Sequence, residues 1–166
     1  DETMHQNDYL TIEETEELIK KMGAVYLHTC NCKTIKFYQD KPTNVCMGFN
    51  KGINTDFDRG HGEELSVEKA IELVKQFNKN GLMQVGEEDG LCNCDGLCCY
   101  PSRLAHKLDS KYVYPRAHYD IIWDRDICLN CGICTKICNF NAFYFDNDDN
   151  VVYNREKCWG CTICSA

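Results

Sequence analysis

The C-terminal part of the sequence carries four cysteines at a spacing that suits metal chemistry. Cys128, Cys131, Cys134 and Cys138 follow the pattern Cys-x2-Cys-x2-Cys-x3-Cys. Three thiolates at three-residue intervals can reach three iron corners of a 4Fe–4S cube from a single loop. A fourth cysteine at this distance cannot fold back to the same cube, so it ligates a neighbouring cluster. The pattern therefore predicts iron–sulfur chemistry.

A second set of cysteines repeats this spacing further along the chain, at Cys158, Cys161 and Cys164. We call it the second triplet, and the first triplet comprises the earlier cysteines at the same spacing, Cys128, Cys131 and Cys134. Between the two copies, residues 143–145 and 151–153 are apolar or aromatic and flank the polar stretch DNDDN. This arrangement predicts a β-hairpin inside an internal repeat of about thirty residues.

Residues 119–166 resemble the dicluster bacterial ferredoxin family on the strength of these two patterns. The resemblance implies two 4Fe–4S clusters with crossed ligation, in which Cys138 completes the cluster of the second triplet. The fourth ligand of the first triplet would then stand at about position 168, beyond Ala166. Ligation by three thiolates, or by a thiolate from residues 92–99, is the alternative. One departure is Asn139, because the family usually has proline after the fourth cysteine.

Seven further cysteines, here called the N-terminal cysteines, precede the repeat: Cys30, Cys32, Cys46, Cys92, Cys94, Cys98 and Cys99. Their order along the chain resembles the N-terminal region of anaerobic iron–sulfur electron-transfer proteins. We expect a third 4Fe–4S cluster, held by the first three of these cysteines and one of the last four. Cys92 and Cys94 are better placed for this role, whereas the adjacent Cys98 and Cys99 should not bind one iron together.

Zinc is the main alternative for both groups of cysteines. In the repeat, Cys128-x2-Cys131 and Cys158-x2-Cys161 could form a four-thiolate zinc site. That interpretation leaves the remaining cysteines of the repeat unexplained at cluster spacing. For the N-terminal cysteines, a structural zinc site and free or redox-active thiols are both open. Among the histidines, His28 is the candidate metal ligand, because it lies two residues before Cys30.

Composition excludes several classes of function. The formal net charge of −8 argues against nucleic-acid binding, which needs a concentrated basic surface. No apolar run approaches the roughly 20 residues of a membrane span, and no secretory signal is present. Fourteen cysteines at metal-ligand spacing in such a chain predict a cytoplasmic protein with reduced or metal-bound thiols. A start at Asp1 rather than methionine predicts a fragment of a longer protein.

The local patterns predict an α+β fold in two parts. Residues 1–118 should form a small helical, loop-rich region with cysteine loops, followed by a ferredoxin-like dicluster domain at 119–166. Thr11 with Glu14 predicts the start of one helix and Gly23 its end. Ser66 and the apolar spacing after it predict a second helix over residues 65–82. The stretches between and after these helices, near 30–62 and 86–100, are expected to be mostly loop.

These observations predict an electron-transfer protein, because clusters ligated entirely by cysteine have no open site for a substrate. Its expected partners are redox proteins or a larger oxidoreductase complex, with neither nucleic acid nor a membrane span. The alternative is a reductase with a catalytic N-terminal cluster or a Cys98/Cys99 redox pair. A zinc-stabilised interaction module is the third hypothesis.

Overall fold

Six strands from the N-terminal part of the chain form one antiparallel sheet. The computed structural model describes residues 7–36, 42–111 and 115–165. The strand order is β1-β5-β6-β3-β2-β4, and every pair of neighbouring strands is antiparallel. The strands are β1 (Asp8–Leu10), β2 (Val25–Thr29), β3 (Asn44–Gly48), β4 (Gly62–Leu65), β5 (Met83–Glu87) and β6 (Gly90–Cys94).

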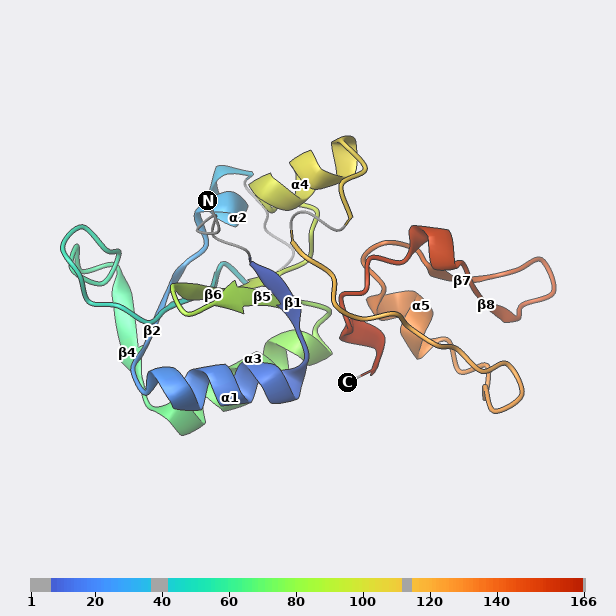
Figure 1. Ribbon diagram of the computed structural model, residues 1–166, viewed down its shortest axis with the longest axis horizontal. Coiled ribbons are helices and arrows are strands. Elements are labelled where there is room, and N and C mark those ends of the chain that lie inside the picture. The colour runs from blue at the N-terminus through green and yellow to red at the C-terminus, as the bar shows by residue number, and fades with distance from the viewer. Residues whose placement is uncertain (1–6, 37–41, 112–114, 166) are drawn as a thin grey trace.

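Two amphipathic helices, α1 (Ile12–Met22) and α3 (Val67–Lys79), cover one face of this sheet. Both lie below the strands in Figure 1 and pack against each other. Both predicted helices are confirmed, although the second covers 67–79 within the predicted 65–82. Thr11 and Glu14 form the capping box, and Gly23 closes α1 with a φ of 70°. The Ser66 hydroxyl accepts a hydrogen bond from the backbone of Lys69 and begins α3.

The main hydrophobic core lies between these helices and the sheet. Its fully buried members include Ile19 from α1, Val74 from α3, and Val45 and Leu91 from the strands. Burial of such side chains stabilises the fold by about 1.5–3 kcal/mol each relative to an exposed position. This core fixes the sheet against the two helices. Other elements cover the opposite face of the sheet.

A buried amide network runs through the same core and ties three strands together. The Gln84 side chain of β5 donates to the Asn93 side chain of β6 at 3.0 Å. Asn93 in turn donates to the backbone carbonyl of Val45 in β3 at 2.7 Å. Asn78 of α3 donates to Gln84 at 2.8 Å, so the network also reaches the covering helix. Because buried amides need partners, these bonds favour one register of the strands.

The expectation that residues 30–62 are mostly loop is confirmed among the described residues, whereas the same expectation for residues 86–100 was wrong. These segments contain the short helix α2 (Asn31–Ile35), the strands β3 and β4, part of β5, and β6. The strands are at most five residues long and contain cysteine, asparagine and glycine in place of a run of β-branched residues. Pairing with strands distant in sequence and packing on the core decide their conformation, and local propensity does not reveal this.

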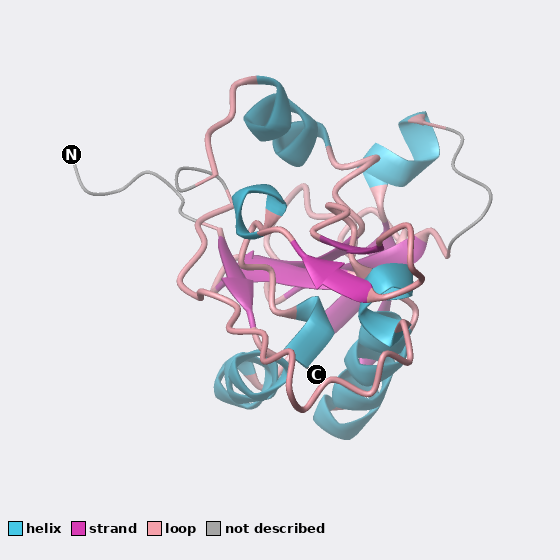
Figure 2. Ribbon diagram, turned by 90° about the vertical axis from the view of Figure 1, so that its right-hand side faces the viewer, coloured by secondary structure: helices cyan, strands magenta, loops and turns pink. Residues whose placement is uncertain are grey.

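The second face of the sheet is covered by α2, by α4 (Tyr100–Lys107) and by the C-terminal repeat. Helices α2 and α4 lie above the strands in Figure 1, and Figure 2 shows the strands passing between helices on both sides. Tyr9 and Met83 from the sheet form a second buried cluster with Cys161 and Ile163 from the repeat. The N-terminal and C-terminal parts of the chain therefore share a core at this point.

The C-terminal repeat contains little regular structure apart from the predicted hairpin. Strands β7 (Phe143–Phe145) and β8 (Val151–Tyr153) pair antiparallel, which confirms the hairpin. The short helix α5 (Ile133–Ile137) and the 3-10 helices η1 (Arg155–Lys157) and η2 (Ile163–Ser165) complete the described elements. The protein is thus a small α+β structure, as expected. Among the described residues, no helix is long and apolar enough to cross a membrane.

Replacing Asn93 with alanine should destabilise the protein. The change leaves the Gln84 amide and the Val45 carbonyl without this partner inside the core, at an expected cost of about 1–3 kcal/mol in the free energy of unfolding. Urea denaturation followed by circular dichroism measures this change. As a matched control, Gln76→Ala removes an exposed amide that bonds Glu72 on the helix surface, and should cost less than about 0.5 kcal/mol. Equal losses in the two variants would contradict a register-fixing role for Asn93.

Candidate metal centres

A row of side chains crosses the second face of the sheet and carries two cysteines at its centre. Tyr9 of β1 lies opposite Val85 of β5, and Val85 lies opposite Cys92 of β6. The Cys92 thiol is hydrogen-bonded to Cys46 of β3, and Cys46 lies opposite His28 of β2. Directly opposed residues of antiparallel strands project to the same face. The sheet therefore presents Cys46 and Cys92 on the face that α2, α4 and the repeat cover.

Two short helices bring further thiols to the same place. Cys30 is the residue before α2, and Cys32 lies within it. Cys99 occupies the corresponding position before α4. The charges of Cys99 and Cys30 both act on the Cys32 thiol, which places these three groups near one another. Strands and helix starts that are far apart in sequence thus converge on one cysteine-rich site.

The thiols of this site share protons through hydrogen bonds. A bond with Cys46, supported by the backbone and charge of Lys33, lowers the pKa of Cys30 to about 6. The pKa of Cys46 is strongly raised, because Cys30 and Cys92 both accept its proton and because it is desolvated. Thiolates so close together repel one another, and a bound cation relieves that repulsion. The arrangement is therefore compatible with metal binding.

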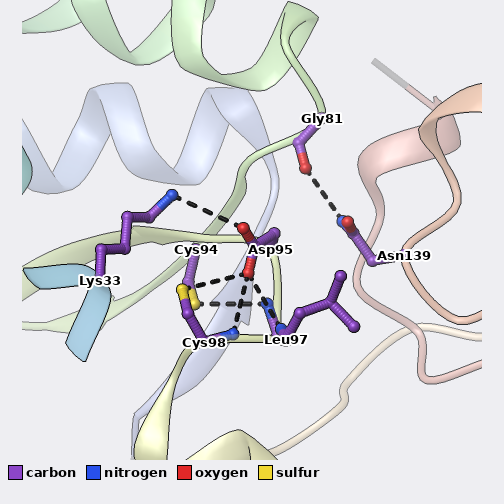
Figure 3. Close-up of polar contacts among 8 residues, drawn as sticks. Lys33, Gly81, Cys94, Asp95, Leu97, Cys98 and Asn139 are labelled. Atoms are coloured by element: carbon purple, nitrogen blue, oxygen red, sulfur yellow. Dashed lines mark hydrogen bonds and ion pairs between the residues drawn. The ribbon is translucent and has the colours of Figure 1, made fainter. Parts of the chain in front are cut away.

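A second group within the N-terminal cysteines is fully buried. Cys94, Asp95 and Cys98 place one ligand atom each within 4.8 Å of one another. The exposed fractions are 5% for Cys94, 0% for Asp95 and 2% for Cys98. The Cys94 sulfur accepts a hydrogen bond from the backbone of Gly96 at 3.3 Å. Figure 3 shows the two sulfurs side by side with the Asp95 carboxylate next to them.

The two oxygens of Asp95 have different neighbours. Oδ1 accepts hydrogen bonds from the backbone of Leu97 at 2.9 Å and from the backbone and thiol of Cys98, both at 3.3 Å. Oδ2 lies 3.6 Å from Nζ of Lys33, whose side chain is also fully buried. Burial raises the pKa of Asp95, but the Leu97 backbone and the Lys33 charge outweigh burial, so the pKa is lowered overall. The carboxylate is therefore held ionised.

Sequence reasoning did not find Asp95 or Lys33. Nothing in the stretch Cys94-Asp95-Gly96 marks the aspartate as buried, because acidic residues in turns are usually exposed. Tertiary packing alone reveals that the two charges meet.

In the C-terminal repeat, Cys138 lies with the second triplet. Burial first, and then the charges of Cys158 and Cys138, raise the pKa of Cys164 to about 11. Burial and the same neighbours raise the pKa of Cys161. Burial and the charges of Cys128 and Cys131 raise the pKa of Cys134 in the first triplet, and the charge of Cys134 in turn acts on Cys164 of the second. Which thiols ligate which cluster stays a prediction.

Asn139, at the position where the ferredoxin family usually has proline, joins the repeat to the sheet region. Its side-chain amide donates to the carbonyl of Gly81 at 3.0 Å, and Figure 3 shows this bond. Proline has no such donor. The next residue, Phe140, packs beside Gly96 and stacks on Trp159 at a centroid distance of 5.5 Å. After Cys138, Asn139 thus contacts the segment between α3 and β5, and Phe140 contacts the loop that follows Cys94.

His28 and the two tryptophans have structural partners. His28 pairs with Asp56 at 3.0 Å. Trp159 is buried under His106, with ring centroids 3.9 Å apart, whereas Trp123 packs edge-on against Phe143 at 6.4 Å. Both tryptophans therefore take part in ring packing.

Gly160 of the second triplet loop has a φ of 60°, and a Cβ there would lie 2.3 Å from the carbonyl oxygen of Tyr119. This close approach to the chain explains why glycine is needed at the position.

These features describe a small cysteine-rich α+β protein whose fourteen free thiols, all in described residues, gather in groups compatible with iron–sulfur binding. No known protein-family profile matches the chain, and no solved structure matches it. A partial similarity exists to the archaeal-type glutamate synthases [NADPH] of Thermotoga maritima and Thermotoga sp. strain RQ2, with 38% identity over 40 residues in both cases. The similar segment is 24% of this chain and 8% of the length of those curated relatives.

Replacing Asn139 with alanine should loosen the junction between the repeat and the sheet region. Loss of the hydrogen bond to Gly81 should lower the free energy of unfolding by about 0.5–1.5 kcal/mol. Chemical denaturation of the metal-loaded protein measures this loss. Lys136→Ala, at an exposed position of the neighbouring helix, is the control and should have little effect. If Asn139→Ala were as stable as the control, the bond would not hold the junction.

Proposed function

We propose that this protein is an iron–sulfur electron-transfer protein that relays single electrons to or from a partner oxidoreductase. The observation that carries the proposal is the gathering of its cysteines at cluster spacing, and the effect of the Cys138 charge on Cys161 and Cys164 supports it. Two 4Fe–4S clusters would occupy the repeat, one on the first triplet and one on Cys138 with the second triplet. Clusters ligated by thiolate carry electrons without binding a substrate.

A third 4Fe–4S cluster would be held by the N-terminal cysteines. Cys30, Cys32 and Cys46 supply three thiolates, and Cys92 is the fourth ligand that the contacts favour. It is hydrogen-bonded to Cys46 and acted on by the charge of Cys30. A cavity of about 390 Å³ borders Cys46 and Cys92, so there is room for a cluster beside these thiols.

Relay between the centres is supported by their common location. The N-terminal thiols and the repeat lie on the same face of the sheet. The contact of Phe140 with Gly96 brings the segment after Cys138 against the turn that follows β6, the strand that carries Cys92. Electrons would therefore pass between the N-terminal cluster and the cluster of the second triplet.

The net charge and the free thiols indicate what kind of partner and compartment would suit this electron-transfer protein. A net charge of −8 favours a partner with a basic docking surface. A reducing compartment such as the cytoplasm would keep the thiols available for iron. The partial similarity to proteins named as NADPH glutamate synthases agrees with a place in a redox system or in a larger oxidoreductase.

A reductase with a catalytic N-terminal cluster is the second candidate function. It is favoured by the same cavity, which His28 lines together with Cys46 and the exposed Cys92 and which could admit a small substrate. A redox reaction at the Cys98/Cys99 pair is less favoured, because Cys98 is 2% exposed. Reduction of an added disulfide or other acceptor by the isolated protein, abolished in Cys92→Ser, would support the reductase over the carrier.

Metal analysis of anaerobically purified protein tests the number of clusters. Three 4Fe–4S clusters require about twelve irons and as many acid-labile sulfides per chain. Cys30→Ser should lower both by about four, with the electron paramagnetic resonance signals of the repeat unchanged. Thr34→Ala on the same helix is the control, since it removes a hydroxyl and no thiol, and its iron content should match the unmodified protein. Zinc without sulfide would refute the electron-transfer proposal.

The crossed arrangement in the repeat has its own test. Cys138→Ser should remove the cluster of the second triplet and leave that of the first triplet, because Cys138 lies among the thiols of the second. Iron, sulfide and spectroscopy of the reduced protein report which cluster is lost. Lys136→Ser, at an exposed position two residues before Cys138, keeps every thiol and serves as the control. Loss of the first-triplet cluster instead would show that ligation is not crossed.

A further inference from the structure

The buried group of Cys94, Asp95 and Cys98 differs from the rest of the N-terminal cysteines in the space around it. Cys46 and Cys92 border a cavity, whereas these three side chains are at most 5% exposed. A 4Fe–4S cube holds each thiolate on a separate iron corner, so its ligands stand farther apart than the ligands of one ion. The tight and closed geometry here fits a single ion better than a cube.

The distances agree with coordination of one metal ion. Zinc binds cysteine sulfur at about 2.3 Å and carboxylate oxygen at about 2.0–2.2 Å, so two donors on one tetrahedral ion lie roughly 3–4 Å apart. The sulfur of Cys98 lies 3.3 Å from Oδ1 of Asp95, and the Cys94 thiol is hydrogen-bonded to the thiols of both Cys98 and Cys99. An ion would take the place of the thiol protons that now fill these contacts.

The charges around the group also balance for a divalent ion. Two thiolates and a carboxylate bring three negative charges into a fully buried place, which is costly without compensation. A divalent ion and the buried ammonium of Lys33 bring three positive charges. Lys33 lies 3.6 Å from Oδ2 of Asp95, and Oδ1, which also accepts hydrogen bonds from the backbones of Leu97 and Cys98, is the oxygen in contact with the Cys98 sulfur. A partner of this kind orients a ligating carboxylate.

We propose that Cys94, Asp95 and Cys98 bind one divalent ion of the zinc type, separate from the iron–sulfur clusters. Mixed sulfur and oxygen donors suit zinc or ferrous iron. The site closes the turn between β6 and α4, which carries Gly96 against Phe140 of the repeat. Its ion fixes the turn that connects the N-terminal thiols to the repeat. The proposal goes beyond the proposed electron transfer and does not require the third cluster.

The test is metal analysis of the full chain after anaerobic reconstitution with iron and sulfide, followed by dialysis against a low concentration of zinc sulfate. The unmodified protein should hold one zinc ion per chain in addition to its iron. Asp95→Asn should lose this zinc and keep its iron and sulfide. Lys33→Met should bind the ion about 10–100-fold more weakly, because the carboxylate loses its orienting partner. Retention of the zinc in Asp95→Asn, or absence of zinc in the unmodified protein, overturns the proposal.

Cys32→Ser is the matched control for the separate identity of the site. This variant should contain about four fewer irons per chain and an unchanged amount of zinc. If the protein has no third cluster, the iron content will not change, and the zinc result remains valid. If Asp95→Asn removes about four irons, the group belongs to a cluster and the proposal is wrong. X-ray absorption at the zinc edge of the unmodified protein keeps the test valid if a variant fails to fold. Two or three sulfurs with at least one oxygen support the site, and four sulfurs overturn it.

Discussion

The buried amide network of Gln84 and Asn93 fixes the register on which the candidate metal centres depend. Side chains along a strand alternate between the two faces of the sheet. A slip of one residue in β6 would therefore move every side chain of that strand to the opposite face. Leu91 and Asn93 would then leave the core, and Cys92 and Cys94 would enter it. By bonding to Gln84 and to the carbonyl of Val45, Asn93 makes such a slip unfavourable, because it would leave buried amide groups without partners.

With this register in place, the two faces of the sheet carry different chemistry. The face under α1 and α3 carries the main hydrophobic core together with the buried amides of Gln84 and Asn93. The other face presents Tyr9, Val85, Cys92 and Cys46 in one row. Its β1 and β5 end packs against the repeat, and its β6 and β3 end faces the short helices α2 and α4. One sheet thereby holds both cysteine regions side by side.

The negative charge of the crowded thiols favours the binding of cations at these sites. Crowded thiols share protons, so that Cys30 and Cys99 have pKa values lowered to about 6 by bonds with Cys46 and Cys94. The buried Asp95 adds a further negative charge and draws Lys33 into the interior. Neither a carboxylate nor a lysine is placed inside a small protein without a partner. The negative charges of the thiolates and of Asp95 need compensation in the folded chain, and a bound metal ion can provide it.

Local signals predicted a good deal of this protein. The cysteine spacing, the capping box at Thr11, the apolar period after Ser66 and the hairpin around DNDDN each depend on residues a few positions apart, and such short-range patterns are readable in one sequence. The six-stranded sheet, the pairing of Lys33 with Asp95 and the bond from Asn139 to Gly81 were not predicted. Each joins residues distant in the chain, and their energy exists only once the core has formed. The sequence by itself thus determined which ligand atoms are available for metal, and the tertiary structure decided which of them share a site, because proximity across strands is a property of the packed sheet.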